Sequence, residues 1–149
     1  MFTISADHYR KYGRYTDLIP GTFAHRQHWT EEFRRCRDGY TIGKYTLTGK
    51  NYFWLNYYRL LSVLSDDQGN KRRKEDFPGF FAKQYEFFHY KELCKKLGKD
   101  INSFKSRGVG FSEMSASDVA CDYTVFPNSY SIITAFAEGY VTQTLSKVW

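Results

Sequence analysis

The residues with the clearest chemical potential form one glycine-containing stretch in the last third of the sequence. It comprises Lys105, Ser106, Arg107, Gly108, Val109, Gly110, Phe111 and Ser112. A phosphate-binding loop needs a flexible turn with inward backbone N–H groups, a cation for the phosphates, and a hydroxyl for Mg²⁺. In the usual frame G-x-x-x-x-G-K-[ST], Gly110 takes the second glycine position and Ser112 the Mg²⁺ position. The spacing predicts a phosphate site, although a short glycine motif is often only a tight turn.

The cations of this stretch depart from the usual frame. Phe111 stands where lysine is expected, whereas Lys105 supplies a lysine at the first position and Arg107 a second cation. We therefore expect Lys105 to reach a bound phosphate from the opposite end of the loop.

The segments on either side of this stretch must position it. The pattern predicts an extended run over residues 100–105 and a helix over residues 113–123, with Met114, Ala116, Val119, Ala120 and Tyr123 inward. A β-type run over residues 130–136 and the start of a helix over residues 137–149 follow. The order strand, glycine loop, helix, strand, helix predicts a parallel βαβ unit with a right-handed crossover, and hence an α/β fold.

Further helices are predicted upstream. Residues 80–97 have a helical pattern that Gly98 ends, and a helix capped by Thr22 or Thr30 runs to Gly39. Residues 40–58 leave two alternatives open. They form either a hairpin around residues 48–50 or a buried helix that begins within residues 52–55, because a short apolar run fits both.

The composition and the polar segments of the chain limit the class of protein and its domain organisation. The chain has 149 residues, 42% hydrophobic and 26% charged, with a net charge of +6, which is typical of a globular protein. No apolar run approaches the roughly 20 residues of a membrane helix, and the start does not resemble a signal peptide. Residues 1–21 are interpreted as a polar arm, and residues 65–76 as a linker with four consecutive basic residues. This linker is either solvated or a contact for phosphates or a partner.

The spacing of the cysteines and histidines indicates neither a disulfide framework nor a zinc site. Cys36, Cys94 and Cys121 are odd in number and widely spaced, which favours a reduced, cytosolic protein. His25 and His28 are three residues apart, but no second pair with zinc spacing follows, so a solvated or capping role is preferred.

The displaced lysine resembles the large terminase subunit, the DNA-packaging ATPase of tailed double-stranded DNA phages. That family places the loop cation first, in patterns like K-x-R-x-x-G-x-S, and residues 105–112 fit each specified position. Residues 77–88, aromatic and with a glutamine, resemble its adenine-binding segment, and residues 48–57 are similar to a phrase in its N-terminal region. The three segments follow the family's order and together cover residues 22–149.

The resemblance implies roles for individual residues. Gln84 hydrogen-bonds the adenine edge, and Tyr85 or a nearby phenylalanine packs against the base. Lys105 and Arg107 neutralise phosphate charge in catalysis, and backbone N–H groups over residues 108–112 hold the β-phosphate. The expected cofactors are ATP and Mg²⁺, with Ser112 as a Mg²⁺ ligand.

The resemblance also implies an incomplete motor. Residues 1–65 are expected to be an N-terminal accessory region, residues 66–76 a linker, and residues 77–149 the first part of a P-loop ATPase sheet. Residues 113–149 offer no apolar strand that ends in Asp-Glu, and Glu138 is only a weak alternative for the catalytic glutamate. The nuclease domain is also missing. We therefore expect the N-terminal part of a terminase, which hydrolyses ATP poorly by itself.

The implied partners are double-stranded DNA, the portal protein and the small terminase subunit, in a ring of identical subunits without membrane association. The implied location is the cytoplasm of the infected bacterium. Two other functions compete with this interpretation. One is a small basic, non-enzymatic nucleic-acid-binding module in which the glycine turn is incidental. The other is a different P-loop enzyme such as a nucleotide kinase, which the missing lysine at position 111 disfavours.

Overall fold

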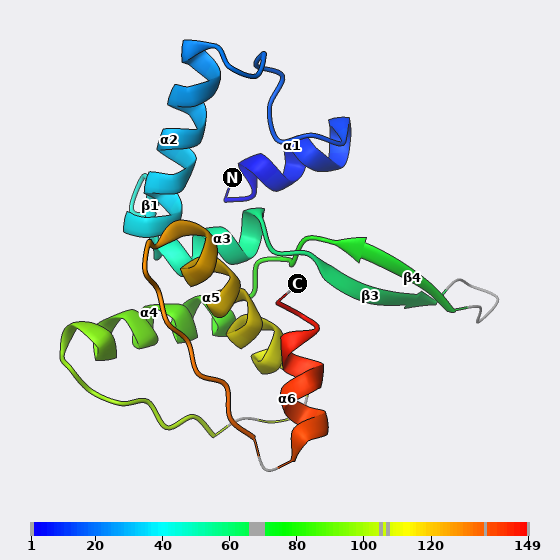
Figure 1. Ribbon diagram of the computed structural model, residues 1–149, viewed down its shortest axis with the longest axis vertical. Coiled ribbons are helices and arrows are strands. Elements are labelled where there is room, and N and C mark those ends of the chain that lie inside the picture. Colours follow the sequence, from blue (N-terminus) through cyan, green and yellow to red (C-terminus); the bar gives the residue numbers. More distant parts are fainter. Residues whose placement is uncertain (1, 66–70, 105, 107, 136, 149) are drawn as a thin grey trace.

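The computed structural model describes residues 2–65, 71–104, 106, 108–135 and 137–148. These residues form helices and two antiparallel hairpins (Figure 1). The helices are α1 (Ile4–Tyr12), α2 (Phe23–Asp38), α3 (Gly49–Asn56), α4 (Ala82–Lys96), α5 (Phe111–Val125) and α6 (Glu138–Leu145), and the strands are β1 (Tyr40–Ile42), β2 (Tyr45–Leu47), β3 (Leu60–Ser65) and β4 (Lys71–Asp76).

Helix α3 is the centre of the core, and it settles the alternative left open by the sequence. Thr48 caps it, because the Thr48 side chain accepts a hydrogen bond from the Asn51 N–H at 3.2 Å. All of its residues except Lys50 are buried, and it packs against α1, α2, α4 and α5. The buried helix therefore forms, although it begins at Gly49 and not within residues 52–55, and the hairpin around residues 48–50 is wrong. The hairpin that does form lies earlier, with Tyr40 paired to Leu47 and a turn at residues 43–44.

A close approach fixes α3 against the end of α2. A Cβ atom at Gly49 would collide with the backbone carbonyl of Cys36, so only glycine fits there. Thr22 caps α2 by accepting from the His25 N–H at 3.2 Å, and Gly39 ends it, as the sequence predicts.

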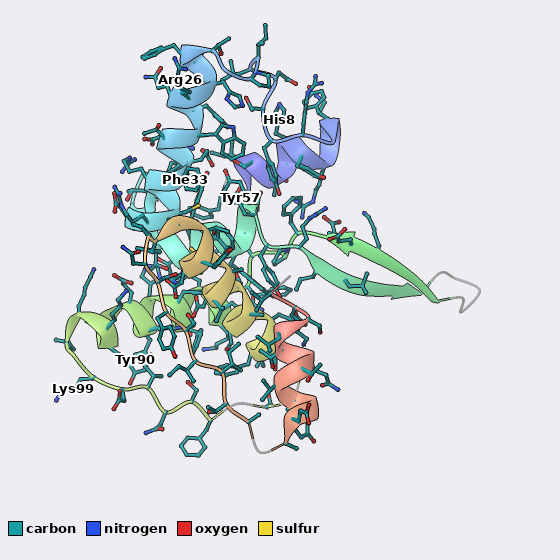
Figure 2. The ribbon with its side chains drawn as sticks, viewed as in Figure 1. His8, Arg26, Phe33, Tyr57, Tyr90 and Lys99 are labelled. Carbon is teal, nitrogen blue, oxygen red and sulfur yellow. The ribbon has the colours of Figure 1, made fainter. Side chains whose placement is uncertain are left out.

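The predicted polar arm contains a helix, α1, that is tied to the core by buried polar groups. The Asn56 Oδ1 atom accepts from the Ser5 N–H at 3.0 Å, and the Glu32 carboxylate accepts from the Ser5 hydroxyl at 2.9 Å. Glu32 also accepts from the hydroxyls of Tyr52 and Tyr57. Tyr57 therefore lies where α1, α2 and α3 meet (Figure 2).

The predicted linker is wrong for its described part. Residues 71–76 form strand β4, which pairs antiparallel with β3 from Leu60–Asp76 to Ser65–Lys71. The strand was not predicted because its residues are charged, and pairing with the apolar strand that precedes it in the hairpin overrides local propensity. The β3–β4 hairpin projects away from the helices (Figure 1).

Helices α4, α5 and α6 confirm the three helices predicted in this half of the chain, with bounds shifted by a few residues. Met114 and Ala116 are buried on α5 as predicted, but Tyr123 is 68% exposed. The two predicted strands are wrong for their described parts, because residues 100–104 and 130–135 are irregular. The described residues contain no parallel strand pair, so the predicted βαβ unit is absent from them. An extended segment needs a partner for its backbone N–H and C=O groups, and these segments have no neighbouring strand.

Candidate functional site

The glycine turn leads directly into α5. Gly110 has φ +76°, a left-handed conformation that favours glycine, and Phe111 is the first residue of the helix. Among the described residues, no side chain caps this end of α5, and the Met114 N–H donates to the Gly110 carbonyl at 2.9 Å. Ser112 lies exposed in the first turn, as the sequence predicts. The N-terminus of a helix of this length favours an anion through its N–H groups and dipole.

The two predicted loop cations flank Ser106 in the sequence. Lys105 and Arg107 lie outside the described residues, so their phosphate-binding role stays a prediction. Between them, Ser106 is exposed and contributes to a cavity.

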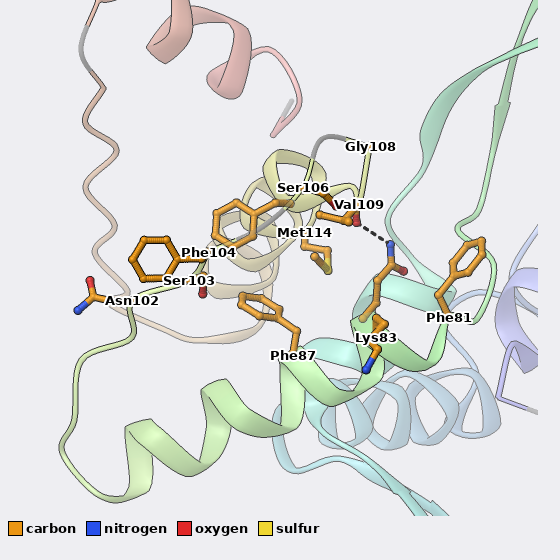
Figure 3. A pocket seen from close by; sticks show the side chains of 12 residues that line it. Phe81, Lys83, Phe87, Asn102, Ser103, Phe104, Ser106, Gly108, Val109 and Met114 are labelled. Atoms are coloured by element: carbon orange, nitrogen blue, oxygen red, sulfur yellow. Dashed lines mark hydrogen bonds between the residues drawn. The ribbon is translucent and has the colours of Figure 1, made fainter.

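A cavity of about 660 Å³ lies between α4, the segment before the glycine turn, and the start of α5 (Figure 3). Its size falls within the range of roughly 300–1,000 Å³ that is usual for small-molecule sites. Its lining combines aromatic rings with polar groups, as small-molecule sites do. The lining residues are Phe81, Lys83, Gln84, Phe87, Asn102, Ser103, Phe104, Ser106, Gly108, Val109, Phe111 and Met114.

Gln84 joins α4 to the glycine turn. Its Nε2 atom donates to the Val109 carbonyl at 3.2 Å, which is the dashed line in Figure 3. A Cβ atom added at Gly110 would lie 3.2 Å from the same Nε2 atom, so the absence of a side chain at position 110 gives the amide its place. The structure therefore brings the predicted base-reading residue and the predicted phosphate-binding turn into one cavity.

Tyr85 points elsewhere. Its hydroxyl donates to the Thr46 carbonyl at 3.1 Å. The centroid of its ring lies 4.1 Å from that of His89 and 5.7 Å from that of Phe80. The aromatic rings among the described lining residues are phenylalanines. Among them, Phe87 packs against Phe111 with ring centroids 5.5 Å apart. Of the two stacking candidates named from the sequence, the phenylalanines line this cavity and Tyr85 does not, and base stacking stays a prediction.

Charge around the cavity is modest in its described part. Lys83 is the one cation among the described lining residues, and it pairs with Glu86 at 3.0 Å. In the first turn of α5, Glu113 pairs with Lys147 at 2.7 Å and accepts from the Tyr58 hydroxyl at 2.9 Å. Burial raises the pKa of Tyr58, and the bond to Glu113 raises it further. Lys147 therefore offsets the one carboxylate nearest the turn.

Sequence reasoning missed Trp54, and it included Phe81 only as one unspecified phenylalanine of residues 77–88. The Trp54 indole Nε1 donates to the Gln84 Oε1 atom at 3.2 Å from the buried helix α3. No local pattern links positions 54 and 84. Phe81 lines the cavity just before α4, and the aromatic richness of residues 77–88 is the one signal that points to it.

A second charged cluster lies apart from the glycine turn and is internally paired. Lys50 pairs with Asp122 and donates to the Asp118 carbonyl at 2.9 Å, while Lys91 pairs with the buried Asp118 side chain. Burial lowers the pKa of Lys91, and the nearby Lys50 lowers it further. These pairs join α3, α4 and α5, so their evident role is to hold the helices together.

His25 and the three cysteines of the described part of the chain are committed to the fold. There, no group of three or more His, Cys, Asp or Glu residues could hold a metal ion. His25 accepts from the Trp29 indole Nε1 at 3.1 Å, so it holds its own helix. Cys36, Cys94 and Cys121 are free and buried, and burial raises the pKa of Cys121 to about 12.

Comparisons with protein-family models, with curated proteins and with solved structures gave no match to this chain. Among the described residues, no helix is both long and apolar enough to cross a membrane.

Proposed function

We propose that the chain is the ATP-binding N-terminal part of a large terminase subunit, a motor that packages phage DNA. The observation that carries the proposal is the contact between Gln84 and the glycine turn. The sequence predicts that Gln84 reads the base and that the glycine turn binds phosphate. Gln84 and Val109 of the turn are 25 residues apart in sequence, yet the Gln84 amide donates a hydrogen bond to the Val109 carbonyl. Both line one cavity of about 660 Å³.

The cavity has features that suit a nucleotide. Its aromatic side, with Phe81 and Phe87, offers faces for a base. Its other side carries the glycine turn and the start of α5, whose N–H groups and dipole favour a phosphate. The left-handed Gly110 keeps the backbone free of a side chain next to the Gln84 amide. These features support ATP as the ligand.

Each predicted role has a place in this proposal. Lys105 and Arg107 neutralise phosphate charge, and Ser112 at the start of α5 offers its hydroxyl to Mg²⁺. When bound, ATP supplies a γ-phosphoryl group whose transfer drives the motor. Because the described residues contain no parallel sheet, the proposal rests on the cavity and on the K-x-R-x-x-G-x-S spacing rather than on the α/β architecture.

The wider function follows from the resemblance. The proposed partners are double-stranded DNA, the portal protein and the small terminase subunit, with a ring of identical subunits as the working form. The proposed location is the cytoplasm of the infected bacterium. A net charge of +6 is compatible with a polyanionic partner such as DNA.

Titration with a non-hydrolysable ATP analogue and Mg²⁺ tests the proposal. We expect the chain to bind the analogue and Lys105→Ala to weaken binding at least tenfold, since a bond to a charged group contributes about 1.5–3 kcal/mol. Lys44→Ala is the matched control, because Lys44 lies at the turn of the β1–β2 hairpin, outside the lining of the cavity.

Absence of analogue binding would refute the proposal. If DNA binding were instead strongly salt-dependent and unchanged by Lys105→Ala, the non-enzymatic nucleic-acid-binding module would replace it.

A further inference from the structure

Trp54 contacts Gln84, a lining residue of the candidate nucleotide cavity, from within the core. Its side chain lies in the core on α3 and is 1% exposed, and its indole Nε1 donates to the Gln84 Oε1 atom at 3.2 Å. The ring is held by its neighbours, stacked on Tyr58 with centroids 5.2 Å apart and planes at 24°. The Phe88 ring packs on another side of the indole, with ring centroids 6.4 Å apart. The indole N–H is therefore a fixed donor aimed at one atom of the Gln84 amide.

The contacts of the Gln84 amide allow only one orientation. An indole nitrogen can only donate and a backbone carbonyl can only accept. The Oε1 atom must therefore face Trp54, and the Nε2 atom must face the Val109 carbonyl. A flipped amide would set N–H against N–H and C=O against C=O, which costs both hydrogen bonds.

The fixed amide keeps unused bonding capacity. A side-chain amide has two acceptor sites on oxygen and two N–H donors on nitrogen. Within the part of the chain that the structure describes, Trp54 occupies one acceptor site and Val109 takes one donor, which leaves one acceptor site and one donor of the amide. A 6-aminopurine presents an amino donor beside the N7 acceptor, which matches such a pair, whereas a 6-oxopurine presents two acceptors.

We propose that Trp54 is a positioning residue that fixes the Gln84 amide and thereby makes the cavity select 6-aminopurine over 6-oxopurine nucleotides. This inference rests on the proposed nucleotide-binding function. Of the two groups that orient the amide, the Trp54 indole is buried in the core, whereas Val109 is 37% exposed on the glycine turn. Trp54 is therefore the group that keeps the Oε1 atom from rotating away when a base enters.

The test compares the affinities of ATP and GTP analogues in a competition titration. Trp54→Phe removes the N–H and keeps an aromatic ring. A second variant carries benzothienylalanine at position 54, which keeps the bicyclic shape and lacks the donor. The matched control is Trp29→Phe. The Trp29 indole also donates a partly buried hydrogen bond, to His25 at 3.1 Å, but it lies outside the cavity.

We expect the unmodified chain and Trp29→Phe to prefer the ATP analogue. Both position-54 variants should weaken ATP-analogue binding by about five- to tenfold, as for the loss of one hydrogen bond, while GTP-analogue affinity stays within about twofold. In a Gln84→Ala background, the change at position 54 should have no further effect, because the amide through which it acts is gone.

Other outcomes overturn the inference in distinguishable ways. If the ATP preference persists in both position-54 variants, or if the affinities for both analogues fall together, Trp54 does not set selectivity although nucleotide binding stands. If the unmodified chain binds neither analogue, the proposed function falls and takes this inference with it.

Discussion

The region around Glu32 and the region around the glycine turn treat their polar groups in opposite ways. Glu32 is 3% exposed, and its carboxylate accepts hydrogen bonds from Ser5, Arg35 and two tyrosine hydroxyls. At the glycine turn, the Gln84 amide makes two hydrogen bonds to described residues and keeps capacity for two more, and Phe104 in the same cavity is fully exposed.

This difference separates stability from binding. A buried carboxylate with every neighbour committed holds elements together and has no capacity left for a ligand. A cavity with uncommitted polar atoms and exposed rings contributes less to folding and can accept a ligand. We therefore expect substitutions in the two regions to change different observables.

The largest effect should come from the Glu32 region. Glu32→Ala leaves the hydroxyls of Ser5, Tyr52 and Tyr57 without their acceptor, so the free energy of unfolding should fall by about 3 kcal/mol. Denaturant unfolding measures it. Asp38→Ala is the matched control, because its ion pair with Arg37 is exposed and should contribute less than about 1 kcal/mol. Equal losses in the two variants would show that the buried cluster has no special weight.

The next effect separates stability from binding at the turn itself. Gly110→Ala forces a Cβ atom into a left-handed backbone and against the Gln84 amide, whereas Gly98→Ala forces one into a left-handed backbone with open space. Both should cost about 1–2 kcal/mol of stability. Only Gly110→Ala should weaken binding of an ATP analogue, measured by titration. Similar affinities in the two variants would contradict the placement of Gln84 against the turn.

The smallest effect concerns an ion pair outside both regions. Arg10 bonds Asp76 at 2.8 Å, which lowers the pKa of Asp76 to about 2. Because the folded pKa lies below the unfolded value of about 3.9, the pair stabilises the fold above pH 4 and loses that effect as the pH falls toward 2.

Asp76→Asn should therefore lower stability at pH 7 by less than about 1 kcal/mol and leave it unchanged near pH 2, as followed by thermal unfolding across pH. Glu86→Gln, at an exposed pair with Lys83, is the control. A loss for Asp76→Asn that persists at pH 2 would mean that the effect is not ionic.

The sequence predicted the features that local chemistry determines. Helix α2 follows from its Thr22 cap and Gly39 stop, and α5 begins beside Gly110. The strands were missed or misplaced because strand formation depends on the paired segment as well as on the strand's own residues, as the charged β4 paired with the apolar β3 shows. In the site, Gln84 and the glycine turn were predicted from the sequence. Trp54 was not, because its role arises only where α3 packs behind α4.

The most direct test of the central claim, that Gln84 and the glycine turn share one nucleotide site, is an NMR titration of the isotope-labelled chain with an ATP analogue and Mg²⁺. We predict that the backbone amides of Gly108 and Gly110 and the side-chain amide of Gln84 shift together along one binding curve, while the amides of Gly13 and Gly39 stay in place. Unchanged signals from the turn and from Gln84, or shifts confined to the α1–α3 region, would contradict the account.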